Sequence, residues 1–454
     1  MSSTSPKPSR YYRWLNAPQD ARGLAAFRIL FGALMIFAVV RFWTNGWIHE
    51  LYIAPSTHFT YLGFEWVRPW PAWGMYGHFG VMGAAALGLM IGAWTRISAA
   101  VFFLTFTYAE LIEKAAYLNH YYLVSLLALL LIFVPAGATW SVDAWRRNPP
   151  SSVTVARWAY VLLRSQIAIV YLFAGLAKLN SDWLVRAEPL QTWLRSYGDL
   201  PLVGHVLGEP WVAYAMSWGG ALFDLTIVGW LLLPRTRLVA YASSVFFHGT
   251  IWLLFPVGVF SWVMLISATL FFSPSWPRHL KRPGPSVATP DDGAPRHHAV
   301  ARPLVYIGVA YLVVQLLIPL RFTLYPGNVN WTEEGFRFSW RVMLIEKTGL
   351  VEYEVRTGNG QRQVVYPRSE LTPLQYQMMS NQPDMIHEYA LQLARRFERD
   401  GRGTVRVHAH AWVALNGRPS QRIVRPDIDL AAEPRTLRAS DWIVPLGLPA
   451  ELHR

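Results

Sequence analysis

The chain contains no cysteine, and only 15% of its 454 residues are charged. The missing thiols exclude disulfide bonds, thiolate metal sites and cysteine nucleophiles. The shortage of charge separates the chain from typical soluble domains, in which about 25% of the residues are charged. Because 53% of the residues are hydrophobic and the mean hydropathy is +0.22, the composition predicts a polytopic membrane protein with an attached soluble part.

Motifs of soluble enzymes and of metal sites are missing as well. There is no glycine-rich phosphate loop and no serine motif for acyl transfer. His408 and His410 alternate on a strand-like run, but no third ligand is evident, and His297 and His298 lie in a linker-like stretch, so we expect no metal. The net charge of +13 is assigned to basic inner loops, and no nucleic acid is expected as a partner.

Apolar runs dominate the first 320 residues. A spanning helix needs about 20 residues, and about nine runs meet or approach that length, although the stretch around Pro256 could be a broken pair. Lysine and arginine gather before the first run and in every second loop, which predicts an inside N-terminus and an outside C-terminal part. The nine segments are 24–43, 75–94, 97–113, 120–137, 158–178, 212–233, 238–255, 258–273 and 302–320.

The predicted fold class is a polytopic α-helical membrane protein with a C-terminal extracytoplasmic, strand-rich α+β domain. Residues 1–23 form a cytoplasmic segment and residues 24–320 the transmembrane domain, in which a flexible Pro/Gly-rich inner linker covers about 279–301. In residues 321–454 short alternating runs predict strands, and residues 371–400 predict one or two helices.

Polar side chains inside apolar segments are costly, so they are the first candidates for function. Lys178 ends the segment 158–178. Such a lysine is usually an anchor that reaches the membrane surface, but burial can also keep an amine neutral for use as a base. Tyr171, Ala174 or Gly175, and Lys178 share one helix face. Lys178 is therefore a candidate catalytic base with an anchor as the open alternative, and Tyr171 and Gly175 are candidate cofactor-binding residues.

The predicted topology brings other polar groups to the depth of Lys178. Asn119 and His120 open the segment 120–137 at its outer end and are candidate catalytic residues, with a helix-entry cap or an interfacial position as an equal alternative for His120. His248 lies midway to outward in its own segment and is a predicted cofactor-binding residue. Asp224 is a buried charge with no assigned partner.

Structural roles are expected for the remaining polar groups. Glu110 and Glu113 are expected to pair with Lys114. Arg164 is expected to contact an acidic group or a helix end, and Asp143 to cap a helix.

Seven stretches, taken in order, resemble the vitamin K-dependent γ-glutamyl carboxylase family, including its bacterial members with the horizontally transferred transmembrane (HTTM) domain. They are EKAAYLNHYYL (113–123), TWSVDAW (139–145), LRSQIAIVYLFAGLAKLNSDW (163–183), FHGTIWLLFPVGVFSWVML (247–265), SPSWPR (273–278), NWTEEGFRFSW (330–340) and QRIVRPDIDL (421–430).

The resemblance implies a γ-glutamyl carboxylase, a carbon–carbon lyase with vitamin K epoxidase activity. Its cofactor is reduced vitamin K (menaquinol or phylloquinol), with O2 and CO2 as co-substrates and no metal, and its partner is a Glu-containing secreted protein or peptide. The lysine that matches Lys178 is the family's base for the hydroquinone. The pair that matches Asn119 and His120 is expected to orient the quinol and to stabilise its anions.

Two departures from the family pattern leave alternatives open. Ala177 stands where many animal members have the first of two lysines, and FSWRVMLIEK (338–347) lacks the histidine that they carry there. The alternatives are a quinol epoxidase that carboxylates no peptide, and a non-catalytic quinone- or lipid-binding membrane protein. Each reading predicts an integral membrane protein, in a bacterial cytoplasmic membrane, with its C-terminal domain outside.

Overall fold

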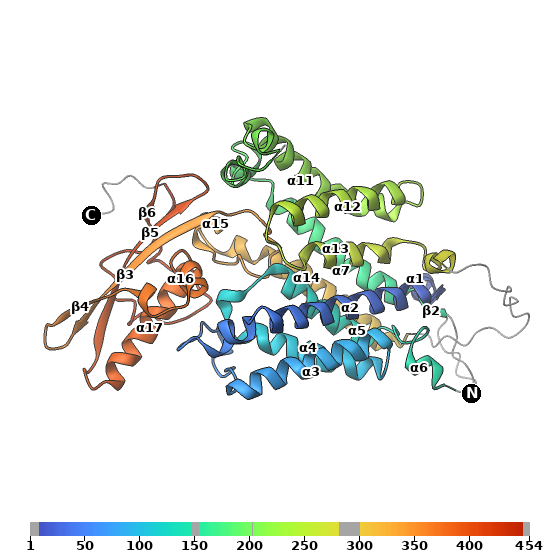
Figure 1. Cartoon of the computed structure of the whole chain (residues 1–454), viewed down its shortest axis with the longest axis horizontal. Helices are drawn as coiled ribbons and strands as arrows, with labels where there is room; N and C mark the ends of the chain where they lie inside the picture. Colours follow the sequence, from blue (N-terminus) through green and yellow to red (C-terminus); the bar gives the residue numbers. More distant parts are fainter. Residues whose placement is uncertain (1–8, 148–153, 202, 281–299, 448–454) are drawn as a thin grey trace, which may run out of the picture.

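A computed structural model describes residues 9–147, 154–201, 203–280 and 300–447. Most of the predicted inner linker, with His297 and His298, lies outside these residues. A helical part makes up one side of the molecule, and a sheet with two helices makes up the other (Figure 1).

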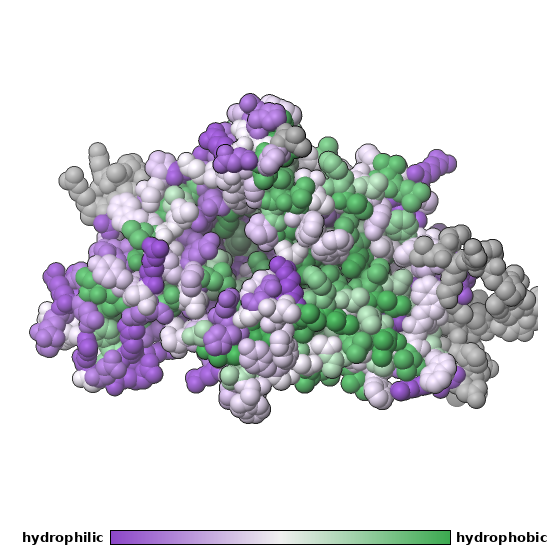
Figure 2. Space-filling view, in the orientation of Figure 1, coloured by the Kyte–Doolittle hydropathy of each residue, from purple (hydrophilic) through white to green (hydrophobic). Residues whose placement is uncertain are grey.

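All nine predicted apolar segments are helical. Within the described residues, six helices are long and apolar enough to span a membrane, namely α2, α3, α4, α7, α11 and α14 with its extension to Leu324. Figure 2 shows hydrophobic residues over the helical part and hydrophilic ones over the C-terminal part. The chain is therefore a helical membrane protein, while the count of nine spans stays a prediction. The nine helices are α2 (Arg22–Thr44), α3 (Ala72–Ile91), α4 (Thr95–Ile112), α5 (Asn119–Phe133), α7 (Trp158–Ala177), α11 (Pro210–Leu232), α12 (Arg237–Leu254), α13 (Phe260–Ala268) and α14 (Arg302–Leu317).

Short elements connect the long helices. The strands β1 and β2 pair antiparallel and join the start of α2 to the start of α7. These elements are α1 (Arg10–Leu15), β1 (Pro18–Asp20), α6 (Val142–Trp145), β2 (Thr154–Ala156), α8 (Ser181–Leu184), α9 (Leu190–Arg195), α10 (Gly204–Leu207) and α15 (Val329–Thr332).

Two groups of helices form the membrane part. Helices α2 to α5 pack in chain order, α13 packs on α2, and α7 packs against α11 and α14. Gly32 permits the close approach of α2 to α3, because an added Cβ would lie 2.6 Å from the backbone nitrogen of Met90. Arg164 donates to the carbonyls of Leu270 and Phe272 at the end of the α13 segment, which confirms the predicted contact with a helix end.

Asp143 binds the start of a helix from outside it, and not as the N-cap residue that the sequence predicted. Its carboxylate accepts hydrogen bonds from the backbone nitrogens of Trp94 and Thr95, each at 2.7 Å, at the start of α4. Its own short helix α6 is capped by Ser141 instead. The TWSVDAW stretch thus has a structural role, because its Asp143 binds the first backbone nitrogens of α4.

The C-terminal domain is a four-stranded antiparallel sheet in the order β4-β3-β5-β6. Strands β3 and β5 alternate between buried and more exposed residues, with Tyr353 opposite Ala409 and Val355 opposite Val407. The long helix α17 packs on β5 and covers the buried face. The predicted helices and most of the predicted strands are confirmed, whereas the alternating run 421–430 forms a strand only at Gln421–Arg422. The elements of the domain are β3 (Lys347–Thr357), β4 (Arg362–Val365), α16 (Pro373–Met379), α17 (Pro383–Arg399), β5 (Val405–Leu415) and β6 (Gln421–Arg422).

Ion pairs join the two parts of the molecule. Lys114, which follows α4, binds Asp384 at 2.8 Å and Glu388 at 2.9 Å, both on α17. The predicted pairing of Lys114 with Glu110 and Glu113 is therefore wrong, because sequence distance favoured near neighbours over partners 270 residues away. Glu113 instead accepts a hydrogen bond from Gln375 of α16.

A buried ion pair supports the start of the sheet and gives the first testable prediction. Lys347 Nζ lies 2.8 Å from Glu333 Oε1, and the two side chains are 2% and 3% exposed. Burial lowers the pKa of Lys347, and Glu333 opposes that shift. Removing one partner of such a pair costs about 3 kcal/mol or more. We expect Lys347→Met to lower the free energy of unfolding of the full chain in detergent by that amount, which thermal unfolding would show as a lower melting temperature. A Lys347→Met/Glu333→Gln double variant that is no more stable than the single one would contradict this account.

Candidate functional site

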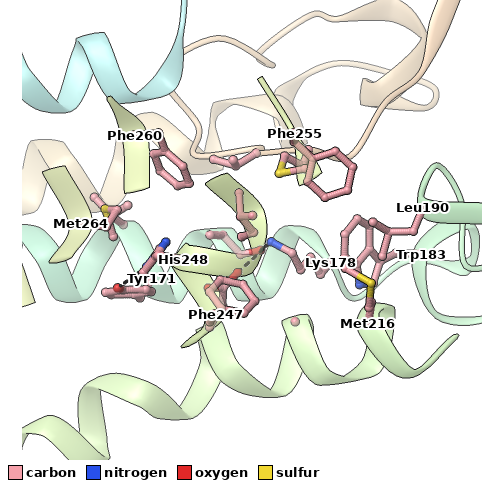
Figure 3. Close-up of a pocket in the computed structure, with 17 residues that line it drawn as sticks. Tyr171, Lys178, Trp183, Leu190, Met216, Phe247, His248, Phe255, Phe260 and Met264 are labelled. Carbon is pink, nitrogen blue, oxygen red and sulfur yellow. Dashed lines mark hydrogen bonds and ion pairs between the residues drawn. The ribbon is translucent and has the colours of Figure 1, made fainter. Parts of the chain in front are cut away.

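A cavity of about 60 Å³ lies among α7, α11, α12 and α13, at the end of the helices that faces the C-terminal domain. It has room for about four water molecules. Figure 3 shows Tyr171 and His248 toward one end, Trp183 toward the other, and Lys178 between them. Apolar side chains make up most of the wall, among them Phe247, Phe255, Phe260, Met216 and Met264.

Local structure places two of these side chains. Helix α7 ends at Ala177, so Lys178 is its C-cap residue. Asn180 then starts α8, because its side chain accepts a hydrogen bond from the backbone nitrogen of Trp183 at 3.0 Å. This tight turn returns Trp183 to the pocket, where the ring centroid lies 5.2 Å from Lys178 Nζ. Trp183 is held there by a 2.7 Å hydrogen bond to the carbonyl of Ser217.

Lys178 is buried and ion-paired. Its Nζ donates to Asp224 Oδ2 at 2.7 Å, and both side chains are 7% exposed. The amine therefore does not reach for water, as a membrane-surface anchor would. Asp224, a buried charge without an assigned partner in the sequence, supplies the counter-charge from α11.

The carboxylate of Asp224 supplies the counter-charge that a buried ammonium group needs. The two residues are 46 positions apart, so their order in the sequence alone does not reveal the pair.

Tyr171 and His248 form the second polar pair of the pocket. Tyr171 Oη and His248 Nε2 lie 3.0 Å apart, and His248 is 1% exposed. The other ring nitrogen of His248, Nδ1, has no hydrogen-bond partner among the described residues. A buried polar atom of this kind calls for an explanation, and a ligand in the pocket would provide one.

Gly175 has a different environment. It is outside the pocket wall, and an added Cβ would lie 2.8 Å from the side chain of Leu225 on α11. Of the two small residues considered, Ala174 lines the pocket. The absent side chain at Gly175 lets α7 and α11 approach closely. Gly220 of α11 lines the pocket beside Trp183, and no sequence signal distinguished it from other glycines.

Asn119 and His120 lie beside the pocket wall. The ring of His120 is 5.8 Å from that of Phe260, which is in turn 5.7 Å from His248. Phe260 thus separates the two histidines. His120 is 7% exposed, and its Nε2 has no hydrogen-bond partner among the described residues.

The segment before β3 closes the pocket from the C-terminal side. Val342 and Met343 line the cavity, and the side chain of Asn119 donates to the carbonyl of Arg341 at 3.1 Å. Trp340 and Met343 have φ angles of 59° and 56°, values that cost energy for residues other than glycine. The segment is held in this conformation over the site. The FSWRVMLIEK stretch contains it, but its pocket contacts could not be derived from sequence.

No group of three histidine, aspartate or glutamate side chains suited to a metal ion occurs among the described residues. His410 lies 3.8 Å from Glu354 on the open face of the sheet.

Comparison with known families matches both parts of the chain. Residues 16–276, more than half of the chain, match the HTTM domain. Residues 300–448 match the lumenal domain of vitamin K-dependent gamma-carboxylase. No solved structure matches the chain. The two domain matches, in this order along one chain, show that the protein belongs to the vitamin K-dependent gamma-carboxylase family with an HTTM domain.

Proposed function

We propose that the protein binds a reduced naphthoquinone in the pocket at Lys178 and couples its oxidation by O2 to the addition of CO2 at glutamate residues of a secreted protein. The observation that carries the proposal is that the buried Lys178–Asp224 pair and the unpartnered Nδ1 of His248 line one apolar cavity. Family membership supports the choice of vitamin K hydroquinone as the cofactor.

The pocket suits a flat apolar ring with polar groups at its rim. Phe247 and Phe260 offer aromatic faces, and Met216, Met264 and Met343 are flexible enough to move aside for a ring larger than the present cavity. When bound, the hydroquinone would supply the electrons that reduce O2 and the driving force for abstraction of the glutamate proton.

The protein's residues would bind the quinol and move its proton. In its neutral amine form, Lys178 Nζ would take the proton of a quinol hydroxyl, and the ion pair with Asp224 at 2.7 Å is the arrangement that would hold the resulting ammonium. His248 Nδ1 would be available to form a hydrogen bond with an oxygen of the quinol, with Tyr171 fixing the tautomer through Nε2. His120 and Asn119 support the wall of the pocket, His120 through Phe260 and Asn119 through Arg341.

The proposal includes the orientation predicted from the basic loops. The N-terminus would lie in the cytoplasm of a bacterium and the C-terminal domain outside. Val342 and Met343 would then separate the quinol from the side on which a secreted substrate arrives. The water-poor wall protects a carbanion from reprotonation.

A second candidate is oxidation of the quinol without carboxylation. It is favoured by Ala177, which stands where many animal members have the first of two lysines and packs among apolar residues around Trp183. In this case the pocket would work as described, but no glutamate would be modified.

One assay distinguishes the candidates. Purified full chain receives reduced menaquinone or reduced vitamin K, O2, labelled bicarbonate and a glutamate-rich peptide. Quinone epoxide together with label fixed in the peptide is expected. Epoxide without label would support the second candidate, and neither product above the background of a Lys178→Ala variant would reject both.

A pair of adjacent glycines tests the location of the quinone. Gly220 lines the pocket, whereas Gly219 has open space where a side chain would extend. We expect Gly220→Val to raise the KM for the quinol about tenfold, because its side chain would fill a small cavity. Gly219→Val causes the same loss of helix flexibility. Its KM for the quinol should stay within about twofold of the value for the unaltered protein. Equal KM values for the two variants would place the quinone elsewhere.

A further inference from the structure

A second hollow lies on the helical part, beside the Lys178 pocket. It is a groove of about 660 Å³ between α2 and the junction of α12 with α13. Leu34, Phe37 and Arg41 form its wall on α2, and residues 255–258 form much of the opposite wall. None of the steps described for Lys178 and the quinol uses this space.

The groove opens toward the side on which a membrane protein meets lipid. Phe37 and Trp252, on its two walls, are 56% and 52% exposed. Phe37 belongs to α2, which is long and apolar enough to span a membrane. Exposed apolar side chains on such a helix face lipid chains, because water does not reach them there. The groove is therefore accessible from the bilayer.

The groove has one end at the membrane boundary. Arg41 lies 4.6 Å from the centre of the ring of Trp47, and tryptophan is typical of the boundary between membrane and water. This end of α2 points toward the C-terminal domain (Figure 1). Leu34 precedes Arg41 by seven residues and so lies about 10 Å further along the helix. The groove thus runs from the boundary into the hydrocarbon region.

One side chain separates the groove from the Lys178 pocket. Phe255 lines both of them (Figure 3) and is 8% exposed. It directly follows α12, which ends at Leu254, and α13 begins only at Phe260. Residues at the ends of elements are the ones that absorb large changes in φ and ψ. Phe255 can therefore swing aside without unwinding either helix.

A quinol with an isoprenoid tail needs more space than the pocket offers. The pocket has a volume of about 60 Å³, whereas ligand sites are commonly about 300 Å³ or larger. Its flexible methionines can make room for the ring, but the tail needs an apolar exit. Val342 and Met343 close the pocket on the C-terminal side. Beyond Phe255, Leu34 and Phe37 offer an apolar path that leads into the bilayer.

We propose that this groove holds the isoprenoid tail of the quinol and that the ring enters the Lys178 pocket from the bilayer past Phe255. The inference rests on the proposed function, since it gives the route and the orientation of the quinol at that site. Because lipid chains are as apolar as the groove, the tail gains little free energy there. Its role is to orient the ring, so its location, and not its contribution to affinity, is the property to measure.

Photolabelling locates the quinone without turnover. The full chain, in nanodiscs of zwitterionic lipid, receives one of two oxidised menaquinone analogues, with a diazirine either on the ring or on the part of the tail next to the ring. Mass spectrometry identifies the peptides labelled on irradiation. We expect the tail probe to label residues 34–41 and 252–262, and the ring probe to label the peptide that contains Lys178. Excess unlabelled menaquinone should lower both signals about tenfold.

The absence of cysteine permits a matched test of the route. Phe37→Cys and Phe246→Cys each introduce a single thiol, at positions whose phenylalanines are 56% and 78% exposed, and of the two only residue 37 lines the groove. Each variant is coupled to pyrene maleimide, a bulky aromatic group. We expect the labelling by both probes to fall at least about tenfold for Phe37→Cys, because the pyrene fills the groove, and to stay within about twofold for Phe246→Cys.

Four results would overturn the proposal. They are labelling by the tail probe outside the groove, an equal effect of pyrene at the two positions, labelling by the ring probe that survives pyrene at position 37, and groove labelling that excess menaquinone does not reduce. The last result would mean that phospholipid chains fill the groove. Because labelling needs no turnover, a protein that is labelled as expected but oxidises no quinol would refute the proposed function and leave the groove standing.

Discussion

Replacing Lys178 by methionine is expected to reduce quinol oxidation at least about 100-fold, the range over which a positioned base accelerates proton transfer. Methionine keeps the length and the apolar contacts of the lysine stem but cannot take a proton. The variant leaves Asp224 buried without its partner, 2.7 Å from the lost amine, which would destabilise the fold. A Lys178→Met/Asp224→Leu double variant removes that penalty and should be equally inactive while regaining thermal stability.

Lys178→Arg separates two roles for the same residue. A guanidinium group keeps the positive charge and the contact with Asp224 but is not deprotonated in proteins. We therefore expect Lys178→Arg to bind the quinone and to stay as inactive as Lys178→Met, measured as epoxide formed in a single turnover. Substantial activity in Lys178→Arg would mean that the charge of the residue, and not its proton, is what the reaction uses.

The sequence predicted the helices and strands well because their patterns are local. The apolar run that became α7 and the alternating run that became β5 each contain their own signal. The span count could not be settled in the same way. Helix α12 has 18 residues and α13 only nine, so length alone does not decide whether they cross the membrane.

The site was predicted only in part. Lys178, Tyr171 and His248 meet in one pocket, as expected of polar groups in apolar segments. Asp224 was recognised as a buried charge, but its partner depends on how α11 packs on α7, which no local pattern encodes. Gly175 was assigned to the helix face of Tyr171 and Lys178, but it faces Leu225, and Ala174 lines the pocket instead.

Long-range contacts also explain why His120 lies near the pocket but does not line it. His120 lies beside the pocket, but Phe260 lies between it and His248. A predicted depth does not say how a helix is rotated about its own axis. This rotation decides which of its side chains line a cavity.

Asp224→Asn is expected to lower kcat about 100-fold while the Kd of the quinone stays within about twofold. Asparagine can still accept a hydrogen bond from Nζ, so the position of Lys178 is kept. What is lost is the negative charge 2.7 Å from the amine. Without it, proton transfer would leave an ammonium group uncompensated in a site with little water, and such a charge is costly by several kcal/mol.

Two measurements decide whether Asp224 acts on the reaction or only on the fold. Asp224→Glu retains the carboxylate one methylene further out and should recover part of kcat, whereas a purely structural role would make this larger side chain no better than asparagine in the close contact of α7 with α11. Thermal unfolding of the three proteins should show that activity follows the charge at this position and not the melting temperature. If Asp224→Asn turns over quinol at the unaltered rate, Lys178 does not need a counter-charge, and the account of the pair as a proton-holding unit fails.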